Sequence, residues 1–249
     1  MRTIICEDKI DLGIMAASEG EAKIKQAIVT NGVANVVFVT GNSQLETLKN
    51  LVQADIPWDK VNIFHLDEFV GVAPTDQSSS EHFLQTYFLS QIKAPLSYTP
   101  INGHVADIKA EVKELNAKMA KYPLDVAFIC IGENGHLAFN DPPADFDTKD
   151  PYIIVDLDVK SRRQQVGEGW FKTLNDTPHK AITMSISEII SSGSIICSCP
   201  DRRKARAVKS CLFDDISPLN PASALRSKKE CYLFLDRQSA CLVFNDECM

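Results

Sequence analysis

The chain has 249 residues, of which 45% are hydrophobic and 24% charged, and its formal net charge is −7 at pH 7. An acidic chain without a long basic run is a poor partner for nucleic acid, so we expect none. The sequence has no apolar segment of membrane-spanning length, and its first residues include Arg2, Glu7 and Asp8 instead of a long apolar stretch. These features favour the cytoplasm and predict no membrane partner.

The cysteines are predicted to be reduced thiols. They are Cys6, Cys130, Cys197, Cys199, Cys211, Cys231, Cys241 and Cys248. Most lie inside apolar runs, where a free cysteine behaves as a small hydrophobic side chain. A chain with no secretory signal is not expected to carry disulfides, and the absence of a Cys-x-x-Cys pair argues against a zinc site.

Helices and short apolar strands alternate along the chain. The pattern predicts helices at residues 11–29, 44–52, 81–90, 107–122, 162–173, 188–191 and 203–212. It predicts strands at residues 35–39, 61–66, 124–131, 152–157, 181–186, 194–199 and 231–235. This alternation indicates an α/β fold with a doubly wound, mainly parallel, Rossmann-like sheet and helices on both faces. No linker or repeat divides the chain, so we expect residues 1–249 to form a single domain.

Four polar clusters directly follow four of the predicted strands. They are Thr40-Gly41-Asn42-Ser43, Asp67-Glu68, Glu133-Asn134-Gly135-His136 and Asp201-Arg202-Arg203-Lys204. Ligands of open α/β sheets bind beyond the carboxyl ends of the strands. If these strands are neighbours, hydroxyls, a carboxylate, an imidazole and an ammonium meet in one crevice, which is typical of an enzyme for a small anionic substrate.

Two of these clusters open helices and are candidates for an anion site. A helix N-terminus presents unpaired N–H groups, and Gly41 permits close approach of the backbone, with hydroxyls from Thr40 and Ser43 beside it. A simple helix cap explains the same residues. Three cations after Asp201 oppose the helix dipole unless an anion binds there, although a solvated charged face is an equal alternative.

The other two clusters offer acid–base groups. Asp67 or Glu68, at a strand end, can act as a general base if one lies beside a substrate. His136 lies on a turn bounded by Gly132 and Gly135, and an imidazole there can pass protons in both directions near neutral pH. Asp141, five residues further on, can fold back to orient it. The remaining histidines, His65, His82, His104 and His179, are interpreted as structural.

These residues, in this order, resemble the glucosamine-6-phosphate deaminase (isomerase) family, which shares its fold with 6-phosphogluconolactonases. The resemblance covers residues 36 to 236. Its strongest segments are Leu66-Asp67-Glu68-Phe69-Val70-Gly71 and Gly135-His136-Leu137-Ala138-Phe139-Asn140-Asp141-Pro142. Thr40-Gly41-Asn42-Ser43 is similar to the family's phosphate loop, and Lys204-Ala205 to its phosphate-binding pair.

The resemblance implies the roles of the site residues. His136 assists opening of the sugar ring, Asp67 moves a proton between C2 and C1, and Asp141 orients His136. The phosphate is held by Thr40, Gly41, Asn42, Ser43 and Lys204, and by an arginine for which Arg162 and Arg163 are candidates, with Arg163 preferred. Glu68 and Gly135 are expected elsewhere in the substrate site. The family implies no metal or organic cofactor and frequently forms homo-oligomers.

The chain departs from the family pattern at three positions. Asn134 and Asp141 stand where the family has Asp and Glu, and Asn42 replaces a glycine, which a left-handed backbone conformation at that position allows. The changes at Asn134 and Asp141 should weaken the orientation of His136. Two alternatives therefore stay open, a 6-phosphogluconolactonase-type hydrolase and a sugar-phosphate-binding regulator that has lost catalysis. Phe69 and the sequence Leu137-Ala138-Phe139 favour the deaminase over the lactonase.

Overall fold

The computed structural model describes residues 1–244, so Cys248 and the end of the expected domain of residues 1–249 lie outside the described residues. Its larger sheet has the strand order β1-β10-β9-β6-β2-β3-β5, and every pairing in it is parallel. The strands are β1 (Arg2–Cys6), β2 (Ala34–Phe38), β3 (Val61–His65), β5 (Ser97–Thr99), β6 (Val126–Ile129), β9 (Ser194–Cys199) and β10 (Cys231–Asp236). This arrangement confirms the predicted α/β fold with a mainly parallel sheet.

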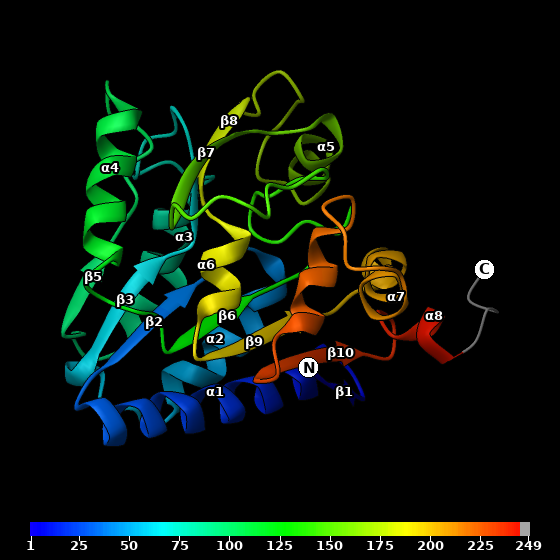
Figure 1. The fold of residues 1–249 in the computed structure, drawn as a ribbon, viewed down its shortest axis with the longest axis horizontal. Coiled ribbons are helices and arrows are strands. Elements are labelled where there is room, and N and C mark those ends of the chain that lie inside the picture. The colour runs from blue at the N-terminus through cyan, green and yellow to red at the C-terminus, as the bar shows by residue number, and fades with distance from the viewer. Residues whose placement is uncertain (245–249) are drawn as a thin grey trace.

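Helices cover both faces of this sheet (Figure 1). On one face lie α1 (Lys9–Asn31), α2 (Leu45–Gln53) and α3 (Ser80–Tyr87), and on the other lie α4 (Ile108–Met119), α6 (Ile186–Ser191) and α7 (Ala205–Phe213). Because side chains alternate along a strand, Phe38 of β2 packs with Leu48 on the first face, whereas Val37 joins Leu115 on the second. Among the described helices, none combines the length and the apolar composition that crossing a bilayer requires.

A smaller sheet stands beside the first and was not expected from the sequence. In it, β8 (Lys180–Met184) pairs antiparallel with both β4 (Asp67–Phe69) and β7 (Tyr152–Asp156). The backbone of Leu66 joins the two sheets, because its N–H donates to Phe38 O (3.1 Å) and its carbonyl accepts from Met184 N–H (2.9 Å). Asp67 is therefore the first residue after the chain leaves the parallel sheet.

Most predicted helix and strand positions are confirmed, with shifts at the ends. Gly32 ends α1 in the left-handed conformation, which glycine adopts readily. The helix predicted at residues 162–173 is instead α5 (Val159–Gly167), which begins after the cap Asp158 and ends two residues before Gly169. The sequence pattern missed β1, β5, the short α8 (Cys241–Phe244) and a 3₁₀ helix at Pro221–Ser227, all of them short or lying at a sheet edge.

Close packing of α1 on α2 depends on Gly13. A Cβ atom at this position would lie 2.5 Å from Glu46 Cβ and 2.7 Å from the Glu46 carbonyl carbon. We expect Gly13→Ala to lower the free energy of unfolding by about 2 kcal/mol, because the overlap outweighs the better helix propensity of alanine. Urea unfolding measures this, with Ser18→Ala on the exposed side of α1 as the control; equal stability of the two variants would contradict the expected overlap.

Candidate active site

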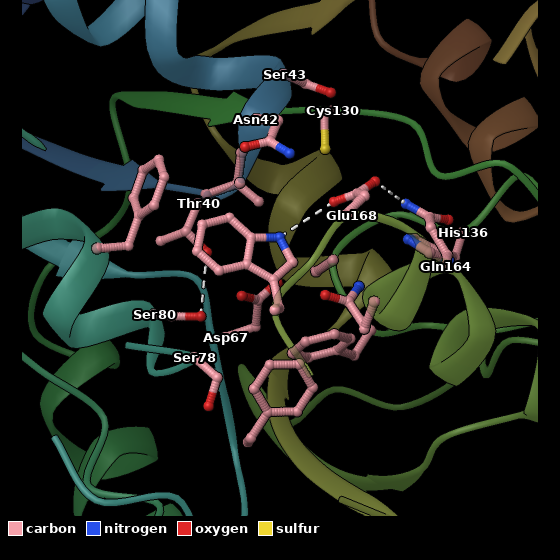
Figure 2. A pocket seen from close by; sticks show the side chains of 18 of the residues that line it. Thr40, Asn42, Ser43, Asp67, Ser78, Ser80, Cys130, His136, Gln164 and Glu168 are labelled. Carbon is pink, nitrogen blue, oxygen red and sulfur yellow. Dashed lines mark hydrogen bonds between the residues drawn. The ribbon is translucent and has the colours of Figure 1, made fainter. Parts of the chain in front are cut away.

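The four strands followed by polar clusters lie side by side in the order β9-β6-β2-β3, so their carboxyl ends meet. A pocket opens at this edge, and Figure 2 shows the side chains that line it. Seven of the residues singled out in the sequence are among them, namely Thr40, Gly41, Asn42, Ser43, Asp67, His136 and Lys204. The convergence expected from the sequence is therefore present.

One end of the pocket is formed by the loop after β2. Gly41 adopts a positive φ of 99°, and Asn42 begins a short 3₁₀ helix that leads into α2. Asn42 itself does not adopt the left-handed conformation, because Gly41 makes the turn before it. The Thr40 hydroxyl donates to Ser80 Oγ (3.1 Å), which ties this loop to the start of α3.

Lys204 supplies a positive charge at the same end. Its side chain comes from the segment after β9, is only 3% exposed, and its Nζ donates to Ser43 Oγ at 2.9 Å. Among the described residues, no carboxylate forms an ion pair with Nζ. Burying an ammonium that has no directly paired carboxylate is costly, so this end of the pocket is suited to an anionic group of a ligand.

Asp67 forms the wall on the other side. It is 4% exposed, and within residues 1–244 no hydrogen bond to its carboxyl oxygens is found. Burial, with a smaller contribution from the charge of Glu68, raises the pKa of Asp67 to about 8. A carboxyl group with a pKa near neutrality can both accept and return a proton.

Glu68 does not line the pocket, contrary to the expectation that it belongs to the substrate site. Strand alternation points its side chain away from that of Asp67 and toward the start of α3. Its carboxylate accepts the Ser79 hydroxyl at 2.7 Å and the backbone N–H groups of Ser80 and Glu81 at 3.2 and 3.1 Å. Glu68 therefore caps α3 and fixes the loop beside the pocket.

A tight turn holds His136 at the end of β6. Gly132 N–H donates to His136 O (2.9 Å), Gly135 N–H donates to Gly132 O (3.1 Å), and Asn134 Oδ1 accepts His136 N–H (3.1 Å). Gly135 has a φ of 86° and shapes the turn without lining the pocket. A Cβ on Gly132 would lie 2.2 Å from His136 Nε2, so the imidazole occupies space that only glycine leaves open.

Asp141 folds back onto His136, with Oδ1 3.3 Å from Nδ1. Its carboxylate also accepts Asn134 Nδ2 (2.9 Å), Asp158 N–H (3.0 Å) and the hydroxyl of Ser161. Burial raises the pKa of Asp141, but hydrogen bonds from His136, Ser161 and Asn134 outweigh it and lower the pKa to about 2. This carboxylate is ionised at neutral pH, so it holds a proton on Nδ1 and leaves Nε2 as the acceptor.

Neither arginine proposed for phosphate binding lines this pocket. Arg162 is buried and donates to the carbonyls of Leu174 and Thr177 at 2.5 and 3.0 Å, so it holds the segment after α5. Arg163, the preferred candidate, is exposed and lines a neighbouring recess with Lys160 and Arg203. Arg163 points away from the pocket that Gln164 lines, because successive helical residues point about 100° apart, and its role in phosphate binding stays a prediction.

Sequence reasoning missed the wall of the pocket formed by the end of α5. Gln164, Gln165, Glu168 and Trp170 all line it, and the Trp170 ring packs edge-on against Phe83 with centroids 5.8 Å apart. The available signal was the Gly169-Trp170 pair, because a glycine that ends a helix can turn the next side chain inward.

Neither a disulfide nor a metal-binding cluster is found among residues 1–244. The seven cysteines within residues 1–244 are all free thiols, and Cys130 lines the pocket. In the same part of the chain, no group of three or more His, Cys, Asp or Glu side chains is arranged to hold a metal ion.

The fold and the pocket define an α/β protein with a buried acid–base pair opposite an anion site. Residues 7–234 match the model of the family Glucosamine-6-phosphate isomerases/6-phosphogluconolactonase, and the chain belongs to this family. It is 28% identical over 243 residues to the glucosamine-6-phosphate deaminase of Streptococcus sanguinis (strain SK36), covering 98% of this chain and 99% of the relative. The corresponding deaminase of Oenococcus oeni (strain ATCC BAA-331 / PSU-1) is 29% identical, with 94% and 97% coverage.

Solved structures show the same relationship. A monomeric glucosamine-6-phosphate deaminase superimposes with a TM-score of 0.89 at 26% identity, over 97% of this chain and all of that one. The 6-phosphogluconolactonase of Shewanella baltica OS155 superimposes with a TM-score of 0.77 at 18% identity, over 95% and 97% of the two chains. At 18% identity, the comparison with the lactonase shows a shared fold and no more.

Asn134 donates its amide to Asp141, and a carboxylate in its place would face another carboxylate at about the same distance. We expect Asn134→Asp to lower the free energy of unfolding at pH 7 by about 2 kcal/mol. The loss should shrink toward pH 4, where the pair shares a proton. Urea unfolding at both pH values checks this, with the exposed Asn175→Asp as the control. Equal losses of stability by the two variants at pH 7 would refute the expected repulsion between the carboxylates.

The raised pKa of Asp67 makes stability depend on pH. An unfolded aspartate ionises near its ordinary pKa of 3.8, whereas folded Asp67 ionises near 8, so the folded state holds an extra proton between these values. The stability of the wild type therefore falls as the pH rises through this range. Asp67→Asn does not titrate, and its stability advantage should grow by about 3–4 kcal/mol from pH 5 to pH 8. A constant difference between the two proteins would show that Asp67 has no raised pKa.

Proposed function

We propose that the protein is an amino-sugar phosphate deaminase and isomerase, which converts glucosamine 6-phosphate or an epimer into fructose 6-phosphate and ammonia. The observation that carries this proposal is the shared pocket of Asp67, His136 and Lys204. An acid–base carboxyl and an oriented imidazole then lie opposite a buried cation. The full-length similarity to glucosamine-6-phosphate deaminases supports the choice of substrate.

The phosphate group of the substrate binds at the end formed by Ser43 and Lys204. The ammonium of Lys204 compensates its charge, and the backbone at Gly41 permits close approach of its oxygens. Holding the phosphate places the sugar ring across the pocket toward Asp67 and His136. Fixing the substrate in this way turns each proton transfer into a step within one complex.

His136 opens the sugar ring. Its Nε2 takes the proton of the C1 hydroxyl and passes a proton to the ring oxygen, while the bond between C1 and that oxygen breaks to give the aldehyde. The Asp141 carboxylate stabilises the imidazolium that forms between these transfers, since it lies 3.3 Å from Nδ1.

Asp67 then moves a proton from C2 to C1. Its carboxylate removes the C2 proton and the electron pair forms a C1–C2 double bond. The aldehyde oxygen takes a proton from the ammonium group on C2 and becomes a hydroxyl. Return of the proton to C1 gives an iminium at C2. Water adds to C2 and ammonia leaves, which yields fructose 6-phosphate.

The hydrogen bonds of Asn134 favour an active enzyme over a regulator that has lost catalysis. Its amide donates to Asp141 and its oxygen accepts the backbone N–H of His136. Together with the Ser161 hydroxyl, these contacts orient His136 without a second carboxylate. The lactonase alternative is supported by the description of the family, which names both activities, and by a likeness of fold at 18% identity, whereas the relatives reported above are deaminases. The cytoplasm and a homo-oligomer remain predictions from the sequence.

The proposal predicts that Asp67→Asn abolishes ammonia release from glucosamine 6-phosphate, with a loss of at least about 10³-fold in kcat, because no base remains for the C2 proton. For the wild type, kcat/KM should rise with pH, reach half of its maximum near pH 8, where Asp67 loses its proton, and level off above that pH. Coupled assays of ammonia and fructose 6-phosphate measure both quantities, with galactosamine 6-phosphate and 6-phosphogluconolactone tested in parallel.

Glu68→Gln is the matched control, because it changes the neighbouring carboxylate that faces α3 and not the pocket. It should retain most of kcat at a temperature where it is folded. Lactone hydrolysis without ammonia release by the wild type would replace the deaminase by the hydrolase. Normal turnover by Asp67→Asn would remove Asp67 as the base.

A further inference from the structure

Glu168 is a carboxylate in the pocket that the proposed reaction does not use. It follows α5 and lines the same cavity as Ser43 and Lys204. Figure 2 shows its side chain extending into the cavity from the wall that also carries Gln164. Because this end of the pocket is suited to a phosphate, an acidic side chain here needs a physical explanation.

Local structure holds Glu168 in a defined place. The N–H of Trp170 donates to Gln165 O (3.0 Å) and the N–H of Gly169 donates to Val166 O (3.0 Å), and Gly169 has a φ of 86°. This pair of bonds is a Schellman motif, which ends α5 and turns the next residue back. The side chains of Gln164 and Trp170 donate to the Glu168 carboxylate at 2.8 and 3.3 Å.

The helix itself does not favour a carboxylate at this position. Glu168 is the C-terminal cap of α5, where the helix dipole is negative. Stabilisation must therefore come from other elements, and the basic side chains that interact electrostatically with Glu168 are Lys204 and Arg203. Arg203 already pairs with Asp201 and Glu133, at 2.9 and 3.3 Å.

Lys204 depends on Glu168 for compensation of its charge. Burial lowers the pKa of Lys204, and the neighbouring Cys130, Cys199, Glu168 and Cys197 together raise it by a larger amount. The three thiols are neutral at pH 7, because burial raises the pKa of Cys130 and Cys197 and brings that of Cys199 to about 12. Of these four neighbours, Glu168 therefore brings the formal negative charge.

The size of the cavity points in the same direction. Its volume is about 60 Å³, whereas pockets for small organic ligands usually measure about 300–1,000 Å³. A hexose phosphate is larger than this space, so side chains of the pocket wall, which include Glu168 and Trp170, have to shift when it binds. Because Glu168 lines the same pocket as Lys204, its carboxylate and the phosphate of a ligand would compete for the positive charge of Lys204.

We propose that Glu168 determines the charge specificity of the pocket, by compensating Lys204 in the free protein and competing with the phosphate of a ligand. When a phosphate pairs with Lys204, the Glu168 carboxylate loses its positive partner. A sugar phosphate that also carries an ammonium group supplies a new partner to Glu168, whereas a sugar phosphate without an amino group does not. The pocket therefore selects amino-sugar phosphates over other sugar phosphates. This inference rests on the proposed function, whose substrate class it explains.

Two unreactive probes test the selection by calorimetry at pH 7.5 and fixed salt, namely glucitol 6-phosphate and 2-amino-2-deoxyglucitol 6-phosphate. Glu168→Gln should bind glucitol 6-phosphate about tenfold more tightly than the wild type, because one opposing charge is removed. The amino compound should gain less, so the wild-type preference for it shrinks. No gain, weaker binding, or equal gains for both probes would overturn the inference.

Two further variants test whether the effect comes from the carboxylate at position 168, from the shape of that side chain, or from the net charge of the protein. Glu168→Asp keeps the carboxylate and should retain the preference of the wild type for the amino probe, while the exposed Glu114→Gln removes one remote charge and should change neither affinity. Thermal unfolding verifies that each variant is folded. Ammonia release by the wild type, measured separately, tests the proposed function: release without the affinity shift overturns only this inference, and the shift without release overturns only the deaminase.

Discussion

The backbone of Leu66 is shared between two sheets, and the site depends on this sharing. Its N–H pairs with β2 of the parallel sheet, and its carbonyl pairs with the end of β8 in the antiparallel one. Asp67 is the next residue, so its carboxyl group lies at the junction, buried by both sheets and facing the strand ends. A raised pKa follows from that burial. One backbone junction thus positions the group and tunes its chemistry.

The two carboxyl groups of the acid–base machinery are separated by their surroundings. Asp67 has no hydrogen-bond donor among the described residues and has a pKa of about 8, whereas Asp141 accepts several donors and has a pKa of about 2. The first can exchange protons near neutral pH, and the second remains charged beside His136. Such divergence between two like groups is the usual way a site assigns separate roles to them. Asn134 belongs to this arrangement, because it adds a donor to Asp141 without adding a charge.

Much of the site was predictable because parallel strands bring their carboxyl ends to one edge. The clusters at Ser43, Asp67, His136 and Lys204 follow four strands that are neighbours in the sheet. Predictions were less successful where side-chain direction mattered. Glu68 turns away to cap α3, and Arg163 points into a neighbouring recess, because adjacent residues on a strand or helix face different ways. Nothing in the spacing of the α5 segment distinguished Glu168 from an ordinary surface acid.

By itself, the sequence determined the alternation of helices and strands, the polar clusters after the strands and the glycine-bounded turn of His136. These are local properties, set by hydrophobic period and backbone freedom over a few residues. Only the tertiary structure decided the second sheet, the burial of Asp67 and Lys204, and the placing of Glu168 against that lysine. Burial and electrostatic compensation depend on what packs against a side chain from distant parts of the chain, and a linear pattern does not contain that information.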